Sequence, residues 1–203
     1  MGKVVFDISM SLDGFMTAAN QRPEEPLGDG GERLHEWAFG DDPRDREVLA
    51  GGAGSLGAVI CGRRTYVDSV PFWEADGPTG PARVPVFVVC HEVPGNVPEG
   101  GVYTFVTDGI EAALKQAQSA AGDKDVTVMG GADTGRQFIQ AGLVDELSIH
   151  LVPVLFGGGT RMFEHLGDGH QQLENLGAVQ TAAATHLRFR VVRQDGVDAS
   201  PSR

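Results

Sequence analysis

Short runs rich in valine and isoleucine alternate along this chain with segments that suit helices. The strand candidates are residues 3–9, 57–61, 84–90, 102–106, 125–129 and 147–154, and the helix candidates between them are 32–39, 43–50, 63–69, 110–121 and 134–141. Near-continuous apolar runs are typical of strands covered on both faces, as in a parallel sheet. The alternation therefore predicts an α/β fold with a largely parallel sheet and helices on two faces.

The end of the chain follows a different pattern. Between residues 172 and 192 no helix signal appears, and Leu187, Phe189 and Val191 alternate so as to share one face of a strand. We expect two antiparallel strands there, in a single domain of residues 1–193. Residues 194–203 are polar and lack periodicity, so we expect a flexible C-terminal tail.

Charge and motif content exclude several classes of function. The 28 acidic and 16 basic residues give a net charge of -12, which should repel phosphate backbones and anionic membranes, so neither nucleic acid nor membrane is an expected partner. No apolar run is long enough to cross a bilayer and no secretory leader is visible, which favours a cytoplasmic protein. Cys61 and Cys90 end apolar runs and are expected to be buried, and the six histidines lack metal-ligand spacing, so no metal site is expected.

Two glycine-rich segments only imitate known phosphate-binding motifs. Residues 52–57 match G-x-G-x-x-G, but they precede a predicted strand, whereas a dinucleotide fingerprint follows one. Residues 130–135 have P-loop spacing, but Arg136 and Gln137 stand where Lys and Ser or Thr are required. Neither segment supports ATP hydrolysis or a Rossmann-type site.

The turn after the strand candidate 125–129 could bind an anion. Gly130 and Gly131 would let a ligand approach the main chain, and Asp133 or Thr134 could cap a helix whose free N–H groups and dipole attract negative charge. An ordinary tight turn between strand and helix is the alternative.

A second junction, Gly62-Arg63-Arg64-Thr65, places two cations in the first turn of a predicted helix, where they oppose its dipole. In an acidic chain this arrangement favours a bound anion, with Thr65 as a further donor. The alternative is that both arginines pair with nearby carboxylates.

Near the N-terminus a predicted strand runs into a loop that contains Asp13-Gly14. The pair is typical of a turn, and a loop at a strand end beside the two junctions is also a common place for binding.

Four segments, Ser11-Leu-Asp-Gly, Gly62-Arg-Arg-Thr-Tyr, Val128-Met-Gly-Gly-Ala and Pro153-Val-Leu-Phe-Gly-Gly-Gly-Thr-Arg-Met-Phe, occur in the order found in dihydrofolate reductase-like proteins. The chain most resembles, over about residues 3–193, the reductase (C-terminal) domain of the bifunctional riboflavin-biosynthesis deaminase-reductase. The resemblance implies a three-layer α/β/α fold with a C-terminal antiparallel hairpin, NADPH as hydride donor and often a homodimer.

Carried over residue by residue, the resemblance implies a cofactor site. Arg63, Arg64 and Thr65, after Gly62, would hold the adenosine 2′-phosphate, which suits a planar and always-charged guanidinium pair. Gly130, Gly131, Ala132, Asp133 and Thr134 would lie against the pyrophosphate and nicotinamide, with Met16, Thr17 and Ala18 on a mobile loop beside the ring.

The residues expected to bind the substrate differ from those of dihydrofolate reductase proper. That enzyme has a Pro-Trp pair before its first helix and a carboxylate within the helix; here the Pro-Trp pair is missing and no single residue matches the carboxylate. Glu32 and Glu36 lie one turn apart, so either could face the cleft, and both could equally be surface charges. Asp13 is the candidate catalytic residue, relaying a proton or holding substrate nitrogens, with Glu36 beside it and Asp68 a weaker candidate. Trp37 and Trp73 could stack on a heterocycle, although core packing is favoured.

The sequence thus predicts an NADPH-dependent reductase that acts on a small heterocyclic substrate, pterin-like or pyrimidine-like. A non-catalytic nucleotide-binding or interaction protein on the same fold is the alternative.

Overall fold

Eight strands form one sheet in the order β5-β4-β3-β6-β1-β7-β10-β9, within residues 2–167 and 169–193, which the computed structural model describes. Their bounds are β1 Val4–Ser11, β3 Leu56–Gly62, β4 Val86–Val89, β5 Tyr103–Val106, β6 Asp125–Met129, β7 Glu146–Val152, β9 Leu173–Gln180 and β10 Thr185–Val191. The first six strands of that order pair in parallel, and β10 and β9 complete the sheet as an antiparallel hairpin. The mostly parallel sheet and the C-terminal hairpin are confirmed.

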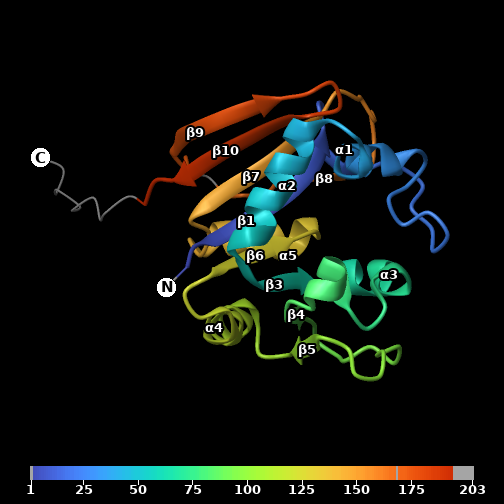
Figure 1. Ribbon diagram of the computed structural model, residues 1–203, viewed down its shortest axis with the longest axis vertical. Coiled ribbons are helices and arrows are strands. Elements are labelled where there is room, and N and C mark those ends of the chain that lie inside the picture. Colours follow the sequence, from blue (N-terminus) through green and yellow to red (C-terminus); the bar gives the residue numbers. More distant parts are fainter. Residues whose placement is uncertain (1, 168, 194–203) are drawn as a thin grey trace, which may run out of the picture.

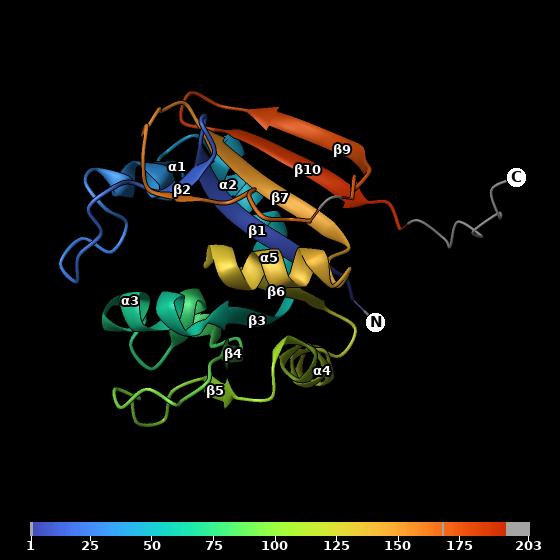
Figure 2. The ribbon, with the colours of Figure 1, turned by 180° about the vertical axis from the view of Figure 1, so that it is seen from behind.

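Helices cover both faces of the sheet (Figures 1 and 2). On one face lie α1 (Glu36–Phe39), α2 (Pro43–Ser55) and α3 (Arg63–Trp73), with α2 crossing in front of β1 in Figure 1. The other face carries α4 (Ile110–Ala121) and α5 (Ala132–Gln140), whose apolar residues share one core, and α5 lies in front of the sheet in Figure 2. The three-layer arrangement expected from the resemblance is therefore confirmed.

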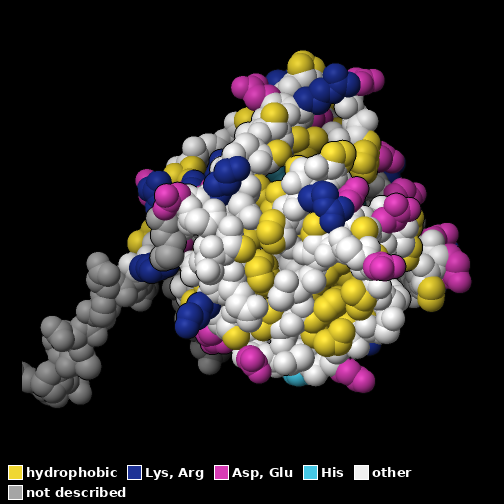
Figure 3. Space-filling view, turned by 60° about the horizontal axis from the view of Figure 1, so that its bottom comes forward, with side chains coloured by type: hydrophobic (Ala, Val, Ile, Leu, Met, Phe, Trp, Pro, Cys, Tyr) yellow, Lys and Arg dark blue, Asp and Glu magenta, His cyan; other side chains and the backbone are white. Residues whose placement is uncertain are grey.

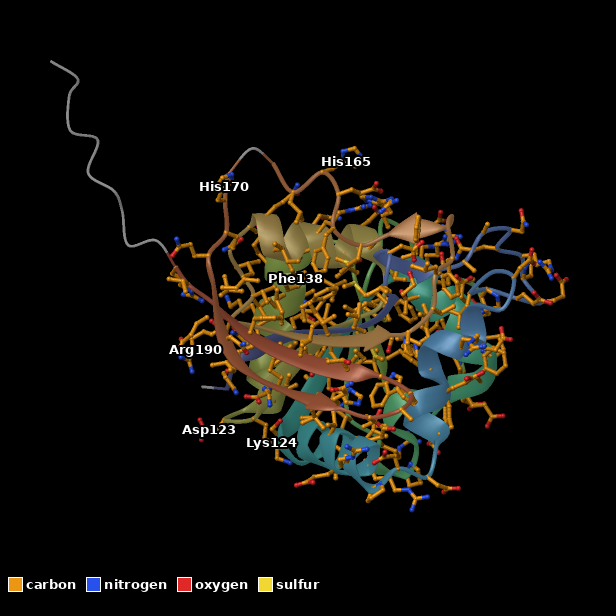
Figure 4. The ribbon with its side chains drawn as sticks, turned by 90° about the horizontal axis from the view of Figure 1, so that it is seen from above. Asp123, Lys124, Phe138, His165, His170 and Arg190 are labelled. Carbon is orange, nitrogen blue, oxygen red and sulfur yellow. The ribbon has the colours of Figure 1, made fainter. Side chains whose placement is uncertain are left out.

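Alternate residues of β1 serve the two faces, because successive side chains of a strand point in opposite directions. Phe6 and Ile8 are buried in the main apolar core with α4 and with Phe138 of α5, which Figure 4 shows between that helix and the sheet. Asp7 and Ser9 point to the face that carries α1–α3. One strand thus supplies the core on one side and polar groups on the other.

Several elements differ from the predicted ones. The predicted helix 32–39 is a 3-10 turn, η1 (Gly31–His35), followed by the four-residue α1, and α2 continues past residue 50 to Ser55 despite three glycines. A second 3-10 turn, η2 (Gly77–Ala82), lies between α3 and β4. The glycine-rich residues 52–57 span the end of α2 and the start of β3. They therefore lie before a strand rather than after one, as expected for a segment that is not a dinucleotide fingerprint.

A small second sheet pairs β2 (Phe15–Thr17) with β8 (Thr160–Arg161), and neither strand was predicted. The two segments are far apart in sequence, so only tertiary contact brings them together. Their pairing holds the loop after β1 against the glycine-rich segment 157–159 that follows β7.

Both cysteines are free and buried, as predicted. Cys61 lies in β3 with no exposed surface, and burial raises its thiol pKa to about 12. None of the helices in the described ranges is both long and apolar enough for a membrane span. The tail 194–203, for which flexibility was expected, lies outside the described residues.

Two helical glycines test how tightly α5 packs on β1. A Cβ on Gly135 would come within 2.5 Å of the Phe6 ring, whereas one on Gly54 of α2 would meet nothing within 4 Å. We expect Gly135→Ala to lower the free energy of unfolding by about 1–3 kcal/mol through overpacking. We expect Gly54→Ala to raise it by about 0.5–1 kcal/mol, because alanine is the better helix former. Urea unfolding of both variants measures this, and equal effects at the two positions would contradict the packing described.

Candidate functional site

A single continuous cleft of about 2180 Å³ runs across the face of the sheet between α3 and the α1–α2 pair. Pockets for one small ligand usually measure about 300–1,000 Å³, so this cleft has room for a dinucleotide and a second molecule. Apolar side chains gather in separate patches on the face drawn in Figure 3, where Lys and Arg side chains are scattered among acidic ones.

The two strand-to-helix junctions singled out in the sequence pack directly against each other in the cleft. A Cβ on Gly130 would come within 2.6 Å of the Thr65 side chain, and one on Gly62 within 2.4 Å of the Thr134 hydroxyl. Gly130 and Gly131 also have φ angles of 61° and 66°, which side-chain-bearing residues rarely adopt. The glycines are therefore required for the β3–α3 and β6–α5 turns to form one continuous surface.

Both helices that begin at these junctions have uncapped N-termini. The N-cap residues are Gly62 for α3 and Gly131 for α5, and neither helix has a side-chain capping bond. The prediction that Asp133 or Thr134 caps α5 is wrong, because both residues lie inside the helix. Asp133 instead pairs with Arg136, one turn along. The free N–H groups of two helix starts thus meet at one place, which suits an anion.

Arg63 and Arg64 stand at the start of α3, exposed at the cleft. Arg64 lies 3.7 Å from the Asp68 carboxylate and donates a hydrogen bond of 2.9 Å to Gln21. Arg63 forms no ion pair with any carboxylate of the described residues. The alternative in which nearby acids neutralise both arginines therefore applies to Arg64 alone.

Of the three residues expected beside the nicotinamide, Met16, Thr17 and Ala18, only the first two line the cleft. The Thr17 hydroxyl accepts a hydrogen bond of 3.1 Å from the Thr160 N–H. Ala18 is buried behind them, with its N–H bonded to the Leu27 carbonyl at 2.7 Å, and is not part of the lining.

Asp13 holds two loops together. Its carboxylate accepts hydrogen bonds from the Ser11 hydroxyl at 2.6 Å and from the N–H groups of Phe156 and Gly157 at 3.1 and 2.7 Å. These bonds, the Ser11 hydroxyl first, lower the Asp13 pKa to about 2. The carboxylate stays ionised at neutral pH and is not part of the cleft lining, which suits an anchor better than a proton donor.

The remaining candidates lie around the cleft. Glu32, Glu36 and Asp68 all line it, with both glutamates exposed. Trp37 is 5% exposed and packs in a core cluster with Leu34, as favoured, and Trp73 is half-buried against the core beneath α3.

Sequence reasoning missed a chain of four ionisable side chains on the cleft face. His150 Nε2 lies 3.2 Å from Asp7 Oδ2, His150 Nδ1 lies 2.7 Å from His186 Nδ1, and His186 Nε2 lies 2.7 Å from Asp45 Oδ1. Asp45 is the buried residue of α2 and thereby ties that helix to the sheet. Asp7 and Ser9 interrupt an otherwise apolar strand, which was the available signal for a polar floor.

Trp37, two serines and Arg188 lie around this chain. The indole ring lies 4.1 Å from the His150 ring and 4.8 Å from the His186 ring, and its N–H donates to the Ser9 hydroxyl at 3.0 Å. Burial acts to raise the Asp7 pKa, but the hydrogen bond and charge of His150, with Ser148 and Arg188, outweigh it and lower that pKa below its usual range. Asp7 is therefore an ionised carboxylate on the cleft floor.

Fold and cleft together define a dihydrofolate reductase-like α/β protein, and comparison with solved structures agrees. A dihydrofolate reductase from Enterococcus faecalis, complexed with NADP(H) and RAB-propyl, superimposes with a TM-score of 0.61 at 15% identity, covering 94% of this chain and 96% of that one. Within this class the chain belongs to the RibD C-terminal domain family, whose model matches residues 2–198.

Two further structures are similar. A Shewanella sp. PV-4 structure, described as a riboflavin biosynthesis protein, has a TM-score of 0.69 at 21% identity, covering 94% of this chain and 99% of that one. RibD from Acinetobacter baumannii has a TM-score of 0.63 at 19% identity, with 95% of this chain matching 59% of its length. No curated protein sequence matches the chain. The expected resemblance is confirmed.

The anchoring bonds of Asp13 predict a pH-dependent stability difference. Because the folded-state pKa lies below the usual 3.8, the contribution of these bonds is complete above about pH 4 and is lost as the pH falls toward about 2. We expect Asp13→Asn to lower the melting temperature at neutral pH, by an amount that shrinks over this acid range. Thermal unfolding of both proteins measures it, and a difference that does not vary with pH would contradict the assignment.

Proposed function

We propose that this protein is an NADPH-dependent reductase that transfers a hydride to a small heterocyclic substrate, pterin-like or pyrimidine-like. The observation that carries the proposal is the Arg63–Arg64 pair at the uncapped start of α3, packed beside the uncapped start of α5. A phosphate bound there would meet both guanidinium groups and free main-chain N–H groups. The family match and the NADP(H)-bound structural neighbour support the same cofactor.

The residues present fit such a cofactor. Gly62, Arg63, Arg64 and Thr65 would hold the 2′-phosphate, since Arg63 has no ion-pair partner within residues 2–167 and 169–193 and the Arg64 pair with Asp68 is long and exposed. Gly130, Gly131, Ala132, Asp133 and Thr134 would hold the pyrophosphate and nicotinamide, with Thr17 and Ala18 supporting the ring from the loop after β1. NADPH would supply a hydride, and the protein would orient it and exclude water.

The part of the cleft toward α1 and α2 would take the substrate. Glu32 of η1 and Glu36 of α1 line it, and either could bind substrate nitrogen groups. Asp13 would contribute by fixing the loop that bears Met16 and Thr17, rather than by donating a proton. We extend the proposal to a homodimer in the cytoplasm, on the analogy of the family.

Removing both arginines tests the cofactor assignment. Arg63→Ala with Arg64→Ala should weaken NADPH binding by roughly 2 to 4 kcal/mol and leave NADH binding nearly unchanged, because only NADPH carries the 2′-phosphate. A fluorescence titration with each cofactor, following tryptophan quenching and nicotinamide emission, measures both affinities.

The matched control is Arg83→Ala with Arg190→Ala, which removes the same charge from two exposed ion pairs outside the cleft lining. It should leave the NADPH preference intact. Equal losses for the two cofactors would refute the 2′-phosphate role. Tight NADPH binding without turnover of any pterin, pyrimidine or quinone in a broad panel would instead favour a non-catalytic nucleotide-binding protein.

A further inference from the structure

We propose that the chain Asp45–His186–His150–Asp7 is a buried proton store that supplies, through Asp7, the proton accompanying hydride transfer. This inference rests on the proposed reductase function and deepens it. It assigns the substrate a C=N or C=O bond in a conjugated heterocycle, because reduction of such a bond requires a proton on the heteroatom.

The number of hydrogen bonds fixes the number of protons in the chain. Three contacts of 3.2, 2.7 and 2.7 Å link the four groups in a line, and each needs one proton between its two acceptors. In the proposed store all three protons reside on the four ring nitrogens, and a carboxylate oxygen accepts a hydrogen bond at each end of the line. Two neutral imidazoles carry only two, so the His150–His186 pair holds one extra proton and one shared positive charge.

The surroundings stabilise that charge. A carboxylate lies at each end of the pair. The Trp37 ring lies 4.1 Å from the His150 ring at an angle of 40° and meets the His186 ring edge-on at 4.8 Å. An aromatic ring attracts a nearby cation, and the attraction is stronger where the pair is desolvated. A buried cation balanced in this way needs no solvent contact.

The store is most exposed at its Asp7 end. Asp7, His150 and His186 all line the cleft, but the side chains of Asp45, His186 and His150 are only 2, 3 and 4% exposed, whereas that of Asp7 is 40% exposed. Protons can therefore enter and leave the chain by way of Asp7, which makes it a reservoir for the cleft rather than a path through the protein.

Strand pairing places that opening beside the proposed cofactor surface. Asp7 of β1 is in register with Met129 of β6, the residue immediately before Gly130, and with Ser148 of β7 on its other side. Neighbouring strands lie about 4.8 Å apart, so the carboxylate is one strand away from the turn that would hold the nicotinamide. A substrate between the two would contact both.

The reaction balances without a further reagent. NADPH would supply the hydride to the carbon of the C=N or C=O bond. The proton passes from His150 Nε2 to the Asp7 carboxylate and from there to the heteroatom, so Asp7 ends the step ionised as it began. The two protons left on the rings make both imidazoles neutral, and one of them still bridges the two Nδ1 atoms. After product leaves, one proton from water in the cleft restores the store through Asp7.

Other charged groups around the chain will contribute to its pH dependence. His35 of η1 faces His150 and Asp7, and its pKa is lowered by burial and by the charge of His150. Arg188 of β10 faces Asp7 and also bonds Glu146 of β7 at 2.6 Å. At the start of α2, Arg44 lies near Asp45, and Asp42 near His186.

Single-turnover reduction by the full chain preloaded with NADPH tests the proposal, with dihydrofolate as the C=N acceptor and menadione as the C=O acceptor. Asp7→Asn and Asp45→Asn should each slow reduction about 100-fold or more at neutral pH, as expected for loss of general acid catalysis. The wild-type rate should fall as the store empties at high pH, and the variants should lose this fall. NADPH affinity should stay within about twofold, since neither residue is placed in the cofactor surface.

Glu111→Gln is the matched control, because Glu111 is an exposed carboxylate of α4, on the face of the sheet opposite the cleft, and is not part of the cleft lining. It should keep both the rate and the pH profile. If wild type reduces either acceptor while Asp7→Asn and Asp45→Asn keep its rate and profile, the store is overturned and the reductase stands.

Nitrogen NMR of the whole chain with ¹⁵N-labelled histidine gives a readout that needs no turnover. In the wild type at neutral pH we expect three ring protons on His150 and His186, one of them between the two Nδ1 atoms. In Asp45→Asn we expect the number of ring protons to fall to two. Two ring protons in the wild type would overturn the store even if Asp45→Asn fails to fold. Three ring protons without reduction of either acceptor or of any panel member would overturn the reductase, and with it the use proposed for the store.

Discussion

The parallel pairing of β1 with β6 on one side and β7 on the other is the constraint on which the rest of the structure depends. It sends Phe6 and Ile8 into the core beneath α4 and α5 and directs Asp7 and Ser9 into the cleft. A shift of one residue would exchange the two sets, burying carboxylate and hydroxyl in an apolar core. The register therefore determines both stability and the chemistry of the cleft.

The same pairing explains why the cleft has two chemically different parts. Where β3 and β6 end, glycines and uncapped helix starts present N–H groups and arginines, which suits a phosphate-bearing molecule. Where β1, β7 and β10 lie side by side, the floor carries carboxylates and imidazoles, which can hold and move protons. A reaction that needs a large anionic cofactor and a proton fits this division.

Much of this arrangement was predictable from local patterns. Apolar runs gave six strands, alternation near the end gave the hairpin, and glycine next to Arg63–Arg64 indicated an anion site at a strand end, where α/β sheets usually bind ligands. The capping of α5 was mispredicted because Asp133 and Thr134 favour N-caps by residue type, while glycine at positive φ occupies that position here. The β2–β8 pair was missed because its partners are distant in sequence.

The sequence by itself determined the six strands of the parallel part of the sheet, the long helices between them and the residue types at the junctions, because these follow from periodicity and local propensity. Only the tertiary structure decided that Gly130 packs on Thr65, that Asp13 anchors the loop at Phe156 and Gly157, and that Asp7, His150, His186 and Asp45 form one chain. The four members of that chain come from β1, β7, β10 and α2. Their hydrogen bonds depend on distances between elements, which strand register and helix docking set and local sequence does not encode.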